Sequence, residues 1–242
     1  MSIAIAVFCK TPGLSPTKTR LGAEIGTALA EEFYRGCIAA IEEVLLTVQQ
    51  SHGSEIKIYW ALAEKEVYDF PIWSKFPRIW TGMGGLGDRI DHVFQELIEL
   101  HDQVFIMGSD SPQITNGYLK RAIKGLSKDD YDGIIGPCSD GGFVLFGTKK
   151  VISKGIWTEV KYSRTDTLKQ LLIKLDYENY RYKMLPALED VDEYDDLIRI
   201  LNDFRHMESN LLPKQKYLLQ WIQRLLISKA FLHEMSKPMV NG

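Results

Sequence analysis

Short apolar runs alternate with segments of helical periodicity from residue 3 to about residue 205. The first run, residues 3–8, is almost wholly apolar, which is typical of a strand buried on both faces of a parallel sheet. Residues 23–49 then repeat apolar side chains at helical spacing and predict one long helix. Alternation of this kind predicts an α/β fold with a mostly parallel central sheet.

The composition limits the kinds of molecule that this chain could bind. A length of 242 residues suits one domain, or one domain with an appendage. The net charge of -3 provides no general basic field, so a nucleic acid polymer is a poor candidate partner. Three widely spaced cysteines without a C-x-x-C pair argue against a disulfide framework or a zinc site. No segment reaches the roughly 20 apolar residues of a membrane span. We therefore expect a cytoplasmic protein that acts on small molecules.

The strongest local motif follows an apolar run at residues 104–107, which predicts a buried strand. Gly108, Ser109, Asp110, Ser111 and Pro112 then end the strand sharply. Ligands of open α/β sheets bind beyond the carboxyl ends of the strands. A carboxylate at Asp110 could hold a divalent cation there, and through it a phosphate. The alternative is that Asp110 only hydrogen-bonds its own turn.

A basic loop between the first strand and the first helix is the second candidate. Lys18 and Arg20 lie at the predicted helix start, with Lys10 earlier in the loop. Loop amides, a helix N-terminus and several cations together favour an anion site. The loop has one glycine, Gly13, so it matches neither the P-loop nor the dinucleotide pattern. A solvated basic loop is the alternative.

A glycine-rich segment at residues 82–89 is the third candidate. Its glycines, Gly85 and Gly87 among them, would let the backbone approach a ligand closely. Asp88 is placed to cap the helix that follows. A flexible connection with a helix cap is the alternative.

Two acidic turns complete the candidate residues. Asp140 precedes two glycines between two apolar runs, a pattern that predicts a close chain reversal. Asp190 and Asp192 lie two residues apart before a helix, so both could face one cation, although Asp192 also suits a helix N-terminus. If the strands are parallel, all these residues meet at one sheet edge. Cations beside an acidic pair predict a diphosphate bridged by a metal ion.

The ordered motifs resemble a bacterial family of predicted glycosyltransferases, DUF2064. The resemblance covers roughly residues 3–204 and rests on the following motifs: Phe8-Cys9-Lys10-Thr11-Pro12-Gly13, Lys18-Thr19-Arg20-Leu21, Gly85-Leu86-Gly87-Asp88-Arg89, Gly108-Ser109-Asp110-Ser111-Pro112, Gly136-Pro137 with Asp140-Gly141-Gly142-Phe143, and Asp190-Val191-Asp192 with Asp196-Leu197. The chain departs from the family pattern at Ser15-Pro16 and at Asp192-Glu193-Tyr194-Asp195.

The resemblance implies a three-layer α/β/α, GT-A-like nucleotide-diphospho-sugar transferase fold, similar to the guanylyltransferases of cofactor F420 biosynthesis. It implies a nucleotide over the first loop, contacted by Lys10, Lys18, Arg20, Gly85, Gly87, Asp88 and Ser109. It also implies a metal ion held by Asp110 with Asp190 or Asp192. Residues 1–208 would form the transferase domain and residues 209–242 a helical extension and tail. The apolar stripe of that extension is a candidate dimer face, lid or packed core.

Three functions remain open. The leading prediction is a metal-dependent transferase that uses a nucleotide-diphospho-sugar donor and a small-molecule acceptor. Lys18 and Arg20 would stabilise the leaving nucleoside diphosphate, and Asp140 is a candidate base. Oxygen ligands serve Mg²⁺ and Mn²⁺ alike. The second function is a nucleotidyltransferase that joins a nucleoside triphosphate to a small phosphorylated acceptor and releases pyrophosphate. The third is a nucleotide-binding module without catalysis.

Overall fold

The computed structural model describes residues 1–67, 70–128 and 130–235, with side-chain burial described to residue 229. Within these residues, one seven-stranded sheet has the order β3-β2-β1-β4-β6-β5-β7. The strands are β1 (Ile3–Cys9), β2 (Ile56–Leu62), β3 (Arg78–Trp80), β4 (Gln103–Gly108), β5 (Gly133–Pro137), β6 (Phe143–Thr148) and β7 (Tyr182–Met184). The predicted α/β fold with a mostly parallel sheet is confirmed.

Strand direction decides which loops meet. β1 lies between β2 and β4 and is parallel to both, with Cys9 opposite Leu62 and Phe8 opposite Gly108. β6 is antiparallel to both β4 and β5, while β7 is parallel to β5. The ends of β1, β2, β3, β4, β5 and β7 and the start of β6 therefore lie at one edge of the sheet. The Asp140 turn, which joins β5 to β6, is the close reversal that the sequence predicts.

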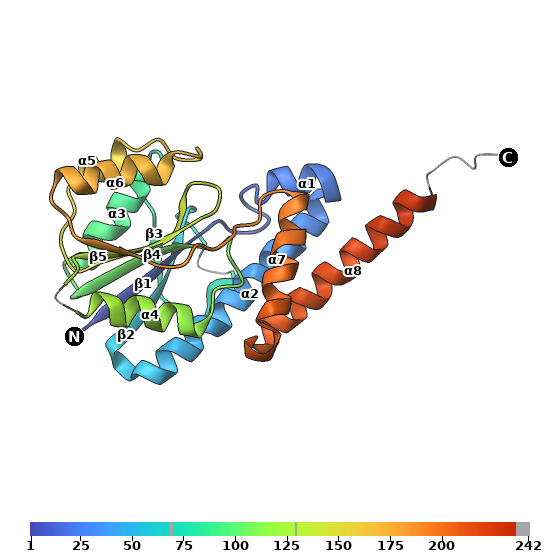
Figure 1. Cartoon of the computed structure of the whole chain (residues 1–242), viewed down its shortest axis with the longest axis horizontal. Coiled ribbons are helices and arrows are strands. Elements are labelled where there is room, and N and C mark those ends of the chain that lie inside the picture. The colour runs from blue at the N-terminus through green and yellow to red at the C-terminus, as the bar shows by residue number, and fades with distance from the viewer. Residues whose placement is uncertain (68–69, 129, 236–242) are drawn as a thin grey trace.

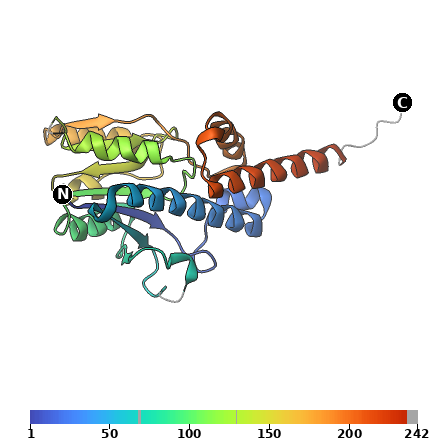
Figure 2. The same cartoon turned by 90° about the horizontal axis from the view of Figure 1, so that it is seen from below.

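Helices cover both faces of the sheet (Figure 1, Figure 2). On one face, α2 (Thr27–His52) and α4 (Asn116–Leu126) pack on Ile5, Val7 and their neighbours. On the other face, α3 (Leu86–Ile98), α5 (Lys154–Thr158) and α6 (Thr167–Tyr177) pack on Ala4, Ala6 and their neighbours. Alternate residues of β1 thus face opposite layers, because successive side chains of a strand point to opposite faces. Both faces are apolar, which explains the near-continuous apolar runs in the sequence.

A third apolar cluster lies beside the sheet. It joins the start of α2 to α1 (Thr19–Ile25), α7 (Tyr194–His206) and α8 (Pro213–Met235). Phe33, Phe204 and Ile222 are fully buried there. The far end of α8 points away from the sheet (Figure 1). The described part of α8 shares this cluster with α1, α2 and α7, and the predicted domain boundary at residue 208 stays a prediction.

Several predicted boundaries differ from the structure. The helix predicted over residues 23–49 is two helices, because Gly26 has φ 94° and interrupts the helical backbone between α1 and α2. Asp88 does cap α3, but from its third residue: Gly85 holds the N-cap position, and the Asp88 carboxylate accepts the Gly85 N–H at 3.1 Å. The predicted tail over residues 236–242 lies outside the described residues. In the part of the chain that the structure describes, no helix has both the length and the hydrophobicity needed to cross a membrane.

Candidate active site

Lys18 is the centre of the candidate site. Its backbone is left-handed, with φ 48° and ψ 47°, directly before α1. The Lys18 side chain is 2% exposed, and its Nζ lies 2.5 Å from Asp110 Oδ1 and 3.4 Å from Asp192 Oδ1. Burial alone would lower the pKa of the ammonium group, but the Asp110 and Asp192 carboxylates more than offset burial and raise it. Lys18 is therefore a buried, charged lysine that joins the first loop to two predicted metal ligands.

Arg20 is the exposed cation of the site. Its side chain is 64% exposed, and its guanidinium contacts Asp192 Oδ2 and, at 3.2 Å, Glu193 Oε1. Both carboxylate oxygens of Asp192 therefore already have a cation partner, Lys18 on Oδ1 and Arg20 on Oδ2. Asp192 does not cap α7. Asp196 Oδ2 accepts the backbone N–H groups of Asp192 and Glu193 instead, each at 2.8 Å.

Asp190 lies on the other side of the site, beside the β5–β6 turn. One side-chain donor atom each from Cys138, Asp140 and Asp190 lie within 4.8 Å of one another. Backbone hydrogen bonds hold the segments together, from Leu188 N to Pro137 O at 3.0 Å and from Ser139 N to Leu188 O at 3.1 Å. Burial and the nearby Asp192 and Asp140 carboxylates raise the pKa of Asp190 to about 7.

The Asp140 and Asp190 carboxylates fit a divalent metal, whereas the Cys138 thiol is a soft ligand that Mg²⁺ and Mn²⁺ do not favour. Carboxylate oxygens are the ligands that Mg²⁺ and Mn²⁺ prefer. Among the described residues, no salt bridge joins Asp190 to a basic side chain. Lys18 lowers the pKa of Asp190, but burial and the three carboxylates of Asp192, Asp140 and Asp110 outweigh it. A cation beside Asp190 and Asp140 would supply the missing positive charge. The sequence motifs missed Cys138, although it directly follows a predicted strand.

Lys10 and Ser109 lie near Lys18 but point elsewhere. Lys10 Nζ donates to Pro16 O at 3.4 Å and contacts no carboxylate at hydrogen-bonding distance within the described residues. Ser109 is buried, and its hydroxyl lies 3.2 Å from Tyr34 Oη. The same Tyr34 hydroxyl accepts the backbone N–H of Lys10 at 3.0 Å. Tyr34 therefore ties the first loop to the end of β4, a role with no local signal in the sequence.

The glycine segment directly follows β3, at the same sheet edge. Arg89 anchors it by donating to Gly84 O and Thr81 Oγ1, both at 3.1 Å. Gly87 is buried against α5, where an added Cβ would overlap the Trp157 carbonyl oxygen. Helix packing thus accounts for glycine at residue 87, and the proposed nucleotide contacts of Gly85, Gly87 and Asp88 stay predictions.

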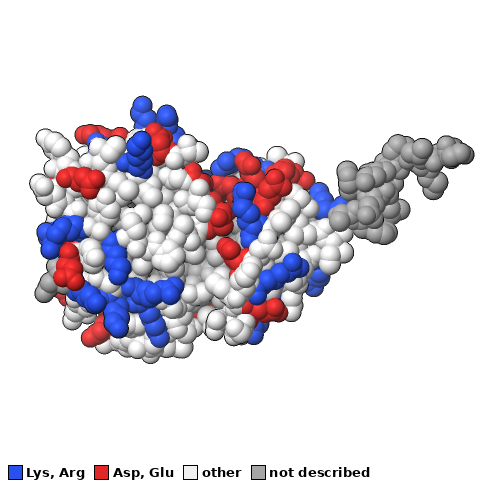
Figure 3. All heavy atoms as spheres, in the orientation of Figure 1, with Lys and Arg blue, Asp and Glu red and all other residues white. Residues whose placement is uncertain are grey.

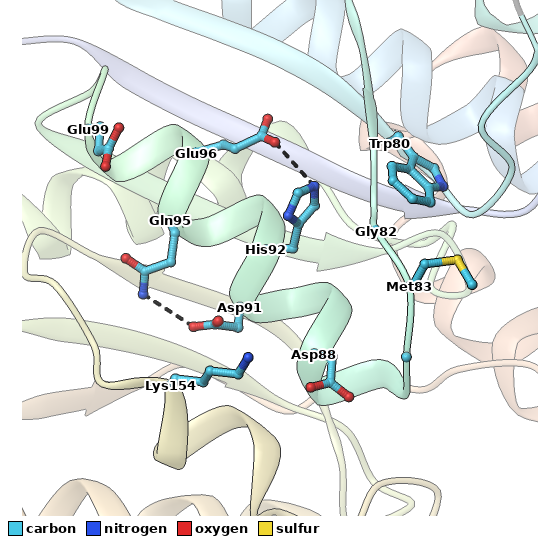
Figure 4. A pocket seen from close by; sticks show the side chains of 11 residues that line it. Trp80, Gly82, Met83, Asp88, Asp91, His92, Gln95, Glu96, Glu99 and Lys154 are labelled. Atoms are coloured by element: carbon cyan, nitrogen blue, oxygen red, sulfur yellow. Dashed lines mark hydrogen bonds and ion pairs between the residues drawn. The ribbon is translucent and has the colours of Figure 1, made fainter.

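An open cavity of about 670 Å³ runs along α3 beside this segment (Figure 4). Trp80 and Met83 border one side, and Lys154 borders the other. Asp88 lines the cavity, but Lys18, Asp110 and Asp190 do not. Its other carboxylates, Asp91, Glu96 and Glu99, make it a poor place for a phosphate.

Acidic side chains gather around α1 and α7, while basic side chains gather near α4 (Figure 3). Exposed acids near the site include Glu24, Glu193 and Asp195. A nucleotide phosphate that enters this region needs compensation of its charge, because like charges repel. Arg20 and a bound metal ion are the groups that could provide it.

A family model described as "Uncharacterized protein conserved in bacteria (DUF2064)" matches residues 40–164, just over half of the chain. The chain belongs to the DUF2064 family. This match confirms the resemblance to the DUF2064 family that the sequence motifs indicate. No curated protein matches the sequence.

Solved structures show the fold of this DUF2064 chain. A candidate nucleotide-diphospho-sugar transferase from Desulfovibrio desulfuricans G20 is 24% identical and has a TM-score of 0.80, with 94% of this chain and 98% of that chain covered. A CMP:2-keto-3-deoxy-manno-octonic acid synthetase complexed with CTP is 12% identical, with a TM-score of 0.53 and coverage of 86% and 100%. A cytidylyltransferase from Leptospira borgpetersenii is 10% identical, with a TM-score of 0.53 and full coverage of both chains. The predicted nucleotide-diphospho-sugar transferase fold is confirmed.

Proposed function

We propose that this DUF2064 chain is a metal-dependent transferase that uses a nucleotide-diphospho-sugar donor. The observation that carries the proposal is the arrangement around Asp190. Its carboxylate lacks a cation partner among the described residues, faces Asp140, and lies at the sheet edge where Lys18 and Arg20 also meet. The fold supports this use of the edge, because open α/β sheets bind ligands there.

The exposure of each site residue indicates which role it can have in the reaction. Arg20, being exposed, is available to a donor phosphate and can grip it with two N–H groups. Asp190 and Asp140 would hold Mg²⁺ or Mn²⁺, which when bound neutralises charge on the leaving nucleoside diphosphate. Lys18 adds positive charge from inside the site, behind Asp110 and Asp192. Stabilisation of the leaving group is thus mainly electrostatic.

Asp140 is also our candidate for the acceptor side. Its Oδ1 accepts the Gly142 N–H at 2.8 Å, which fixes the carboxylate within the β5–β6 turn. The residue is exposed, so a small acceptor can approach it. A carboxylate held in this way can orient an acceptor hydroxyl and accept its proton.

Nucleotidyl transfer is the alternative, and one specific observation favours it. The synthetase with bound CTP and the Leptospira cytidylyltransferase share the fold over most or all of this chain. The same carboxylates and Arg20 would then act on a nucleoside triphosphate and a small phosphorylated acceptor, and pyrophosphate would leave.

The product that leaves distinguishes the two reactions. Purified protein is incubated with Mn²⁺ and either nucleotide sugars or nucleoside triphosphates, with pools of sugars, sugar phosphates and small phosphorylated acids as acceptors. Release of nucleoside diphosphate supports glycosyl transfer, and release of pyrophosphate supports nucleotidyl transfer. Tight nucleotide binding without either product would favour a non-catalytic module.

Two variants connect any activity to the site. Asp190→Asn should reduce turnover by at least roughly 10- to 100-fold, because loss of a residue that only supports a metal ligand already costs that much. Asp102→Asn is the control, because Asp102 is an exposed carboxylate that binds Ser2 just before β4, at the opposite sheet edge. Equal turnover in wild type and Asp190→Asn would contradict the proposed site.

A further inference from the structure

Lys18 already occupies a cation position between two of the predicted metal ligands. Its Nζ lies 2.5 Å from Asp110 Oδ1 and 3.4 Å from Asp192 Oδ1. The side chain is 2% exposed, whereas those of Asp110 and Asp192 are 43% and 36% exposed. The ammonium group therefore lies on the inner side of the two carboxylates, where solvent does not reach it.

Each carboxylate oxygen of Asp192 already faces a cation. Lys18 contacts its Oδ1, and Arg20 contacts its Oδ2. A divalent ion on either oxygen would lie beside an ammonium or guanidinium group, and cations repel strongly at such distances where water is partly excluded. Asp190, two residues earlier, has no such partner among the described residues and lies against Asp140 instead.

The backbone holds Lys18 in this position. The residue has a left-handed conformation, which non-glycine residues adopt at a cost. Gly22 N donates to Lys18 O at 2.7 Å, so α1 begins directly at this residue. Val191 N donates to Asp110 O at 3.2 Å, which joins the end of β4 to the segment that carries Asp190 and Asp192. The cation and both carboxylates are thus fixed by neighbouring backbone.

We propose that Lys18 is a built-in counter-ion that excludes a divalent metal from the Asp110–Asp192 pair and directs it to Asp190. This inference rests on the proposed function only in that both require a metal beside Asp190. It changes the role of two residues: Lys18 is a positioning residue that does not touch the nucleotide, and Asp192 is a partner of Lys18 and Arg20 and does not ligate the metal.

The test is a titration of the protein with Mn²⁺ in the absence of nucleotide. The electron paramagnetic resonance signal of the free ion measures how much Mn²⁺ is bound. Asp190→Asn and Asp192→Asn form a matched pair, since both remove one carboxylate charge within the same short segment. We expect Asp190→Asn to weaken Mn²⁺ binding roughly 10- to 100-fold. Asp192→Asn should weaken it much less, because this variant removes a neighbouring charge and no ligand of the ion. A loss in Asp192→Asn as large as that in Asp190→Asn would overturn the proposal.

Lys18→Met tests the counter-ion directly. Methionine keeps most of the apolar stem, and Asp110 and Asp192 stay hydrated on their exposed sides, at 43% and 36% exposure. We expect this variant to bind Mn²⁺ roughly tenfold more tightly, or to gain a second ion, as for a typical coupling between sites. Arg20→Met is the control, because Arg20 is exposed and leaves Lys18 in place. It should have a smaller effect.

The outcomes separate the two proposals. Unchanged or weaker Mn²⁺ binding by Lys18→Met would overturn the counter-ion role, and if this variant does not fold, the aspartate pair decides alone. If wild type binds no Mn²⁺ but Lys18→Met does, the exclusion by Lys18 stands and the metal at Asp190 fails. Absence of either transfer product, with the expected Mn²⁺ results, would refute the proposed function and leave the counter-ion role intact.

Discussion

Gly141→Ala should disrupt the Asp140 turn, and Gly26→Ala provides a control with the same backbone angle. Gly141 has φ 93° and Gly26 has φ 94° with ψ 143°, so alanine meets the penalty of a positive φ at both. A Cβ at residue 141 would lie 2.5 Å from the carbonyl carbon of Thr165, and closer still to its oxygen. A Cβ at residue 26 would have no atom within 4 Å. The contact with Thr165 is thus the main difference between the two substitutions.

The structure sets the expected magnitudes. A sparsely populated backbone conformation of positive φ costs an alanine about 1–2 kcal/mol at either residue. At residue 141 the turn must also shift, which weakens two hydrogen bonds: Leu168 N to Gly141 O at 2.8 Å and Cys138 N to Gly142 O at 2.9 Å. At about 1 kcal/mol for each hydrogen bond, Gly141→Ala should lower the free energy of unfolding by about 3–4 kcal/mol.

The assay is urea unfolding followed by tryptophan fluorescence, with Mn²⁺ binding measured on the folded variants. Gly141→Ala should be the less stable protein by about 2 kcal/mol and should bind Mn²⁺ more weakly, because Asp140 moves with the turn. Equal free energies of unfolding for the two variants would refute the argument from the Thr165 contact. Intact Mn²⁺ binding by a destabilised Gly141→Ala protein would show that Asp140 is no ligand.

Three further predictions concern single side chains. Asp132 is buried between Arg181 and Lys150, whose hydrogen bonds outweigh burial and hold its pKa well below the usual range. The ionised Asp132 carboxylate therefore contributes its full stabilisation above pH ~4, and this stabilisation is lost as the pH falls. In urea unfolding, Asp132→Asn should lower the free energy of unfolding by about 3 kcal/mol at pH 7 and by less at pH 3. An equal loss at both pH values would contradict this. Asp190→Asn should raise the melting temperature of metal-free protein, because it removes a charge that lies among other carboxylates. A lower melting temperature would contradict the inference that repulsion between these carboxylates destabilises the metal-free protein. Ile222→Ala should cost about 2–4 kcal/mol in urea unfolding, since Ile222 is fully buried in the cluster of α1, α2, α7 and α8; a cost near zero would show that α8 is a loose appendage.

The sequence predicts the sheet and the edge where the candidate residues meet. Strands buried on both faces leave apolar runs that are easy to recognise, and the polar residues that end them mark the edge. The Asp140 reversal is also local, because it depends on two glycines between two strands. Prediction fails at the break between α1 and α2, where an apolar helical pattern continues through Gly26 although the backbone does not.

Pairing within the site could not be predicted from local patterns. Lys18 and Asp192 are 174 residues apart, and Arg20 meets the same carboxylate. Local sequence marks all three residues as polar, but only the packing of α7 beside α1 decides which oxygens are neutralised. Tyr34 illustrates the same limit, since it reads as a helical core residue while its hydroxyl joins Lys10 to Ser109. Charged side chains form pairs through tertiary structure, which periodicity does not encode.

The antiparallel strand β6 has a consequence for how such a protein can change. In a purely parallel sheet, each new loop at the ligand edge is followed by a crossover that must return along the whole sheet. The β5–β6 hairpin avoids this requirement, because its turn begins and ends at the ligand edge. Insertions in this turn would alter the Asp140 side without moving the loop that carries Lys18 and Arg20. Under the proposed function, related chains could therefore exchange one acceptor for another while they retain the same first loop.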